Sequence, residues 1–299
     1  MECGAGATMG RGMHGWGRWG PGDELGALNL LGGPEVLRGL AAARDGTVLS
    51  LAAPIVSGQG FGIVGRPAPA HYMLRDGGDY AAGLAERAGF GFADDVVTLA
   101  THGVTHVDAL AHVWRDGQLY NGFSAGTVTS RGAARLGIDK MPPIVTRGVL
   151  VDCAPGGDRD ARDRVHAGEL SRLLAASDIE LAPGDALLVR TGWLPAFAAG
   201  RADASSWPGL DGDCGPWLAE RGVVLVGADN VAVEAYPSGD PVCQVPLHVE
   251  LLRGHGVYLS ELMDLDALAA SGRDTFLFML APLPLAGAVG SPVAPIAVL

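Results

Sequence analysis

The amino-acid sequence predicts an α/β fold that forms one domain over residues 1–299. Short apolar runs rich in β-branched residues alternate with segments of helical periodicity along the chain. No linker, low-complexity stretch, long charge run or repeat divides the sequence, and 48% of its residues are hydrophobic. A chain of this length can form one or two domains, and the lack of a boundary favours one.

Six apolar runs are predicted to form strands. Most of them are apolar at every position, which is typical of strands that are covered on both faces. Strands and helices do not alternate strictly, so a barrel of eight βα units is not indicated. The predicted strands are residues 48–55, 96–100, 148–153, 186–191, 223–227 and 275–280.

Four other segments are predicted to form helices. Pro34 lies in the first turn of the first helix, where proline is favoured. Asp264 is a candidate N-cap of the last helix, and Gly272 follows its end, as glycine commonly does. The predicted helices are residues 34–44, 167–177, 246–253 and 265–271.

The C-terminal segment, residues 276–299, carries no charge and is long enough to suggest a membrane span. Its four prolines, Pro282, Pro284, Pro292 and Pro295, argue against a helix. We therefore expect a buried strand and then an irregular segment packed into the core, with no membrane association.

The bulk charge excludes some classes of partner. The formal net charge is −12, and no basic stripe is visible, so we expect no nucleic-acid binding. The four cysteines are far apart and form no CxxC pair, and the glycine-rich N-terminus lacks the apolar core of a signal peptide. We expect reduced thiols in a cytoplasmic protein.

Metal-ligating side chains are concentrated in one short segment. His102, His106, Asp108 and His112 lie within eleven residues of a chain that has eight histidines. Imidazole and carboxylate groups bind zinc and manganese, and a catalytic ion commonly takes three protein ligands. On an ideal helix His102 and His106 would share a face without Asp108, so we expect a bent backbone. A structural zinc site would more often use cysteine, and none is near.

This segment, THGVTHVDALAHVW, resembles the HxGTHxDxxxH signature of the metal-dependent cyclase family, which includes kynurenine formamidase and isatin hydrolase. Val104 stands where the signature has glycine, and SEL at 260–262 replaces a more common EN pair. Further likenesses to the family run along almost the whole chain: RWGPGDELGALNLL at 18–31, GADNVAVE at 227–234, HVELLRGHGVYLSELMDL at 248–265 and GSPVAPIAVL at 290–299.

The resemblance implies a site and a fold. His102, His106 and Asp108 match the ligands of a first metal ion, while His248 and Glu261 match ligands of a second ion that Asp108 can bridge. Ser260 competes with Glu261 for this match but cannot replace a carboxylate. The implied cofactor is one or two Zn or Mn ions, and the implied fold is a single-domain layered β/β/α (swivelling) domain with a mixed sheet core. The family also implies a homo-oligomer, either a homodimer or a homotetramer.

The implied activity is hydrolysis of a small, aromatic or cyclic substrate. A metal-activated water attacks the carbonyl carbon of an amide, formamide, lactam or lactone. His112 matches the proton-shuttle histidine, which works with Glu261. Two alternatives remain: a cyclase or dehydratase of a natural-product pathway on the same metal site, and a non-catalytic metal-binding module.

Other residues have weaker signals. Asp229 and Glu234 are candidates to orient metal ligands or to make loop hydrogen bonds. Two GxGxxG matches, at 10–15 and 60–65, lack the strand or helix that a dinucleotide site needs, and no GxSxG motif is present. The candidates to line a substrate pocket are Trp16, Trp19, Phe61 and Tyr72.

Overall fold

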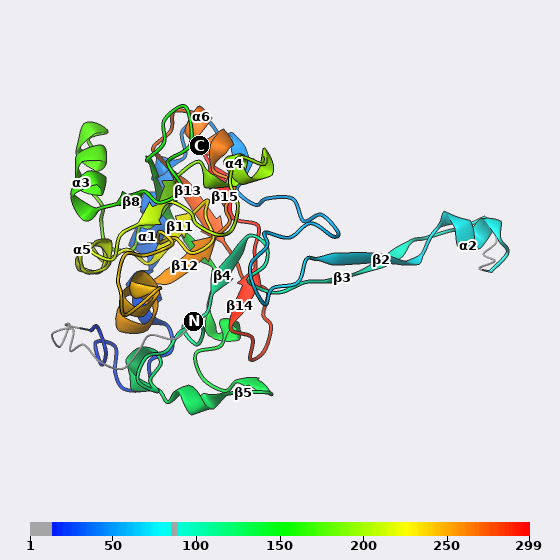
Figure 1. Ribbon diagram of the computed structural model, residues 1–299, viewed down its shortest axis with the longest axis horizontal. Helices are drawn as coiled ribbons and strands as arrows, with labels where there is room; N and C mark the ends of the chain where they lie inside the picture. The colour runs from blue at the N-terminus through cyan, green and yellow to red at the C-terminus, as the bar shows by residue number, and fades with distance from the viewer. Residues whose placement is uncertain (1–13, 85–88) are drawn as a thin grey trace.

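A nine-stranded mixed sheet forms the centre of the molecule (Figure 1). The computed structural model describes residues 14–84 and 89–299. The strand order across the sheet is β1-β15-β13-β7-β9-β11-β12-β4-β14. In that order the strands are Val48–Ser50, Ile296–Val298, Thr275–Leu280, Ile144–Asp152, Ala186–Arg190, Leu225–Ala228, Tyr258–Glu261, His106–Asp108 and Gly290–Pro292.

The strands β7, β9, β11 and β12 are parallel, and antiparallel strands flank them on both sides. Every residue of β9 and β11 is buried, which confirms the expectation of strands covered on both faces. Phe276 lies in the core over Gly148, where a Cβ atom would approach its ring to 2.2 Å. The α/β class and the mixed sheet core predicted from the sequence are confirmed.

Helices pack against the central sheet and against one another. Helix α1 packs on β7 and β13, and α5 packs on the π-helix η5. Helix α1 can approach β7 closely only because residue 39 is a glycine: a Cβ atom on Gly39 would lie 2.5 Å from the carbonyl carbon of Thr146. The α-helices are α1 Gly33–Ala42, α2 Gly77–Ala81, α3 Ala167–Ala176, α4 Trp193–Ala198, α5 Cys214–Glu220 and α6 Asp266–Ala270, and η5 is His248–His255.

Short elements complete the chain. The two-stranded sheets pair β8 with β10, β5 with β6, and β2 with β3. Their strands are β8 Arg164–Val165, β10 Gly209–Leu210, β5 Val128–Thr129, β6 Gly132–Ala133, β2 Ala70–Arg75 and β3 Asp94–Thr98. The 3₁₀ helices are η1 Gly26–Leu30, η2 Tyr120–Gly122, η3 Ala125–Thr127 and η4 Ile138–Lys140.

Strands β2 and β3 form an arm that projects from the body, with α2 near its far end (Figure 1). All five residues of β3 are exposed. The strand predicted at 96–100 is present, but it is not covered on both faces as most of the predicted strands were expected to be. An apolar run has the same pattern in a core strand and in an exposed apolar ribbon, so the pattern alone could not separate them.

The other predicted elements fall close to observed ones, except that the strand predicted at 48–55 ends at Ser50. Strand β13 has the predicted bounds 275–280, and Gly272 follows α6 with a positive φ of 69°, as expected. Segment 246–253 forms a π-helix, and the N-cap of α6 is Leu265, whereas Asp264 accepts a bond from Asp266 N at 3.3 Å.

The C-terminal segment differs in part from expectation. It contains strands β14 and β15, so its backbone is more regular than the prolines indicated. No helix in the described ranges has the length and apolarity to cross a bilayer. Cys153 and Cys214 are free thiols, whereas Cys243 is disulfide-bonded, which corrects the expectation of a reduced thiol there.

Candidate metal centre

Strand β4 places two candidate ligands at one point of the central sheet. His106 and Asp108 lie on β4, which pairs with β12 on one side and β14 on the other. The register sets Glu261 of β12 opposite His106 and Gly290 of β14 opposite Asp108. Because the pairing joins segments far apart in sequence, the sheet itself assembles the centre.

A tight turn before β4 brings in the third candidate ligand, His102. Thr105 anchors the turn, since its hydroxyl donates to Leu262 O at 2.6 Å and accepts from Ala53 N at 2.9 Å. Val104 is buried and is not among the residues with a positive φ, so the turn does not need glycine at this position. The expected bent backbone is present: β3 ends at Thr98, and the turn leads from the arm into β4.

Five buried side chains converge in this centre. Asp108 Oδ1 lies 3.2 Å from His102 Nε2 and 3.5 Å from His106 Nε2. Asp108 Oδ2 lies 3.5 Å from His248 Nε2. The Glu261 carboxylate spans the other side, with its oxygens 3.1 Å from His106 Nε2 and 3.2 Å from His248 Nε2. The structure thus brings together all five residues that the sequence resemblance indicated as ligands.

The donor atoms of this group fit a divalent cation. His102 Nε2, His106 Nε2, both Asp108 carboxylate oxygens and Glu261 Oε1 are buried without a hydrogen-bond partner. Buried polar atoms are normally satisfied, so a convergent unsatisfied set indicates an ion. Nitrogen and carboxylate donors together suit zinc or manganese.

Hydrogen bonds from outside the centre orient two of the histidines. His106 Nδ1 lies 2.7 Å from Val104 O, which leaves Nε2 directed at the carboxylates. Glu234 holds His248, with Oε1 at 2.5 Å from His248 Nδ1, and both Glu234 oxygens accept backbone N–H groups at 247 and 248. Such partners fix the tautomer and direction of a ligand. Of the two candidates for this role, Glu234 performs it.

Asp229 makes loop hydrogen bonds instead. Its carboxylate accepts from Thr191 N, Thr191 Oγ1 and Gly192 N at 2.7–2.8 Å. Burial raises the pKa of Asp229 to about 6, against the lowering effect of these bonds. Asp229 therefore joins the end of β9 to the loop after β11. Ser260, the competitor of Glu261, donates its hydroxyl to His106 O at 2.8 Å.

The charges of the centre are strongly coupled. Burial lowers the pKa of His106, but the Asp108 and Glu261 carboxylates beside it outweigh burial and raise the pKa to about 9. The pKa of His248 is raised well above its ordinary value because the Asp108, Glu234 and Glu261 carboxylates around it likewise outweigh burial. Burial alone would raise the pKa of Asp108, but the nearby histidines, His112 first, hold it well below the usual range.

His112 lies beside the centre. Its ring stacks on that of His102, with centroids 4.1 Å apart, and a ring nitrogen lies within 4.8 Å of ligand atoms of Asp108 and His248. Burial lowers the pKa of His112 to about 3, with neighbouring histidines adding to the effect against the opposing charge of Asp108. Its imidazole is therefore neutral at neutral pH.

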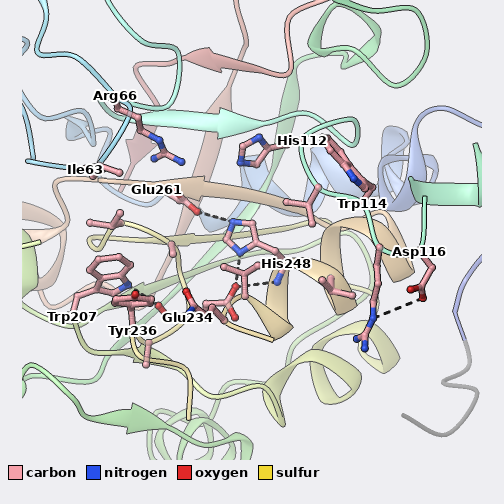
Figure 2. A pocket seen from close by; sticks show the side chains of 18 of the residues that line it. Ile63, Arg66, His112, Trp114, Asp116, Trp207, Glu234, Tyr236, His248 and Glu261 are labelled. Carbon is pink, nitrogen blue, oxygen red and sulfur yellow. Dashed lines mark hydrogen bonds and ion pairs between the residues drawn. The ribbon is translucent and has the colours of Figure 1, made fainter. Parts of the chain in front are cut away.

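A cavity of about 620 Å³ opens onto the centre (Figure 2). His112, His248 and Glu261 form part of its lining. Its aromatic walls are Trp114, Trp207 and Tyr236, with Ile63, Arg66, Arg115 and Gln244 among the other lining residues.

None of the four aromatic residues expected in a substrate pocket lines this cavity. Trp16 donates its indole N–H to Arg253 O, and the guanidinium of Arg18 lies over Trp19. Phe61 packs against Trp193, and Tyr72 is exposed on the arm. Trp114 could have been found, because it ends the histidine motif, whereas Trp207 and Tyr236 have no local signal.

The model of the putative cyclase family matches residues 46–235. The chain belongs to the cyclase family. A crystal structure described as a novel cyclase has the same fold and is 35% identical to this protein. The match covers 96% of this chain and 100% of that chain, with a TM-score of 0.87.

More distant solved structures share the fold of this cyclase-family protein. Isatin hydrolase A from Labrenzia aggregata, solved with benzyl benzoate, is 20% identical over 88% of this chain and 97% of its own, with a TM-score of 0.65. A predicted metal-dependent hydrolase from Bacillus stearothermophilus is 18% identical over 85% and 98%, with a TM-score of 0.53. The cyclase-like layered fold expected from the motifs is thereby confirmed. No curated protein matched the chain.

Metal binding should release protons. In the metal-free protein His106 is protonated below its pKa of about 9, and a histidine ligand must be neutral. We expect Zn²⁺ binding near neutral pH to release at least one proton per ion, and metal affinity to rise as the pH approaches 9. Calorimetric titrations in two buffers of different ionisation enthalpy measure this. A proton count of zero with a flat pH dependence would contradict it.

Gly290 is a residue of the centre that sequence reasoning missed. A Cβ atom there would lie 2.4 Å from His102 Nε2. We expect Gly290→Ala to displace the His102 ring and to weaken metal binding by about 10- to 100-fold, as loss of ligand orientation does. Competition with a chelator measures the affinity. Gly168→Ala is the control, because an added methyl group there meets nothing within 4 Å. Equal affinities of the two variants would show that His102 is not a ligand.

Proposed function

We propose that this protein is a metal-dependent hydrolase that cleaves an amide, formamide, lactam or lactone. The observation that carries the proposal is the set of five convergent ligand-type side chains at the wall of an aromatic-lined cavity, with a neutral histidine beside them. Fold relatives named isatin hydrolase and predicted metal-dependent hydrolase support the same class of reaction.

The residues divide into two groups that would hold metal. His102, His106 and Asp108 would hold a first ion, because their ligand atoms lie within 4.8 Å of one another. His248 and Glu261 would hold a second, on the side of Asp108 that faces His248. When bound, a zinc or manganese ion supplies Lewis acidity, which polarises a carbonyl group and lowers the pKa of a water molecule to about 7.

His112 would move the proton. Its neutral imidazole can take a proton from the attacking water and deliver it to the leaving nitrogen or oxygen. Stacking on His102 keeps the ring beside the metal centre, and Glu261 faces the same cavity. The walls formed by Trp114, Trp207 and Tyr236 would hold an apolar or aromatic part of a small substrate and exclude water.

Replacing His112 separates catalysis from metal binding. We expect His112→Asn to lower kcat by about 10²- to 10⁴-fold, because a positioned acid–base group is lost. The ion at His102, His106 and Asp108 should be retained. The measurements are metal content and steady-state kinetics on N-formyl aromatic amines, cyclic imides and lactones.

The control is His71→Asn, an exposed arm histidine that pairs with Asp95. Full turnover by the His112 variant would refute the proton-transfer role. If the metal-loaded wild type hydrolysed none of these substrates, a ring-closing or dehydrating enzyme, or a non-catalytic metal-binding module, would replace the proposal.

A further inference from the structure

Arg66 carries a positive charge into the cavity beside the metal centre. It is half-buried and lines the cavity with His112 and Glu261. Figure 2 shows its guanidinium directed toward these two side chains. The guanidinium is anchored there, because Nη1 donates to His102 O at 2.7 Å. The charge is thus tied to the same turn that carries the first candidate ligand.

No carboxylate in the described ranges lies within ion-pair distance of Arg66. Arg115, the other cation of the cavity, faces Asp116 at 3.9 Å. Glu234 and Glu261 are engaged by His248. An arginine without an acidic partner is unexpected in a chain with 33 acidic and 21 basic residues. Its remaining N–H groups form a planar fork that matches a carboxylate.

We propose that Arg66 binds a carboxylate group of the substrate. The substrate class is then an N-acyl or cyclic compound that carries a carboxylate next to an apolar or aromatic part. The nature of the bond that is cleaved rests on the proposed function. The aromatic walls would bind the apolar part, and Arg66 would select anionic members of the class.

Matched ligands test this without turnover. The probes are the ortho, meta and para isomers of acetamidobenzoate and the corresponding acetamidobenzamides, whose binding to zinc-loaded protein is measured by calorimetry. For at least one isomer, the carboxylate should bind on the order of 10- to 100-fold more tightly than the amide, as a charge-assisted hydrogen bond does. Arg66→Gln should remove this preference, and the control Arg75→Gln, on the arm outside the cavity, should retain it.

Each result decides the assignment. Equal binding of acid and amide by the wild type, no binding of any acid, or an unchanged preference in Arg66→Gln overturns it. A merely structural role would weaken both ligands equally. Failure of the proposed function is distinct: the acids would still bind preferentially, while N-formyl aminobenzoates would not be hydrolysed.

Discussion

The pairing of β4 between β12 and β14 is the constraint on which the rest of the site depends. Strand β4 has only three residues, yet its register decides which side chains meet. If β4 shifted by one residue in its pairing, His106 and Asp108 would point to the other face of the sheet. The flanking strands therefore act as the template of the metal centre, and the thoroughly buried sheet behind them supplies its rigidity.

This arrangement has an unfavourable electrostatic free energy. Two carboxylates and three imidazoles lie together away from water, where an uncompensated charge is strongly unfavourable. Protons on His106 and His248 balance Asp108 and Glu261 in the metal-free protein. A divalent ion can take the place of these protons, so the charge of the cluster is balanced both with and without the ion. His112, outside the ion-paired group, keeps a neutral ring.

The ligands that lie close together in the sequence could be predicted from residue type and spacing. The ligands that come from distant segments could not be predicted in this way. His102, His106 and Asp108 stand close together in the chain, so ligand type and spacing were sufficient to identify them. Glu261 is brought to His106 by strand pairing across more than 150 residues, and only family resemblance indicated it. Gly290 had no signal, because its role is to leave room for His102. The exposure of the arm was not predicted because its apolar residues resemble those of a core strand.

The position of β14 in the chain affects the order of events during synthesis. Strand β14, Gly290–Pro292, is synthesised after every other strand of the central sheet except β15, yet it pairs with the strand that carries His106 and Asp108. Domains form from the N-terminus as the chain emerges from the ribosome. The histidine motif is made before β14 and gains this neighbouring strand only when residues 290–292 have left the ribosome. Capture of the ion in its final geometry therefore has to wait for the synthesis of β14.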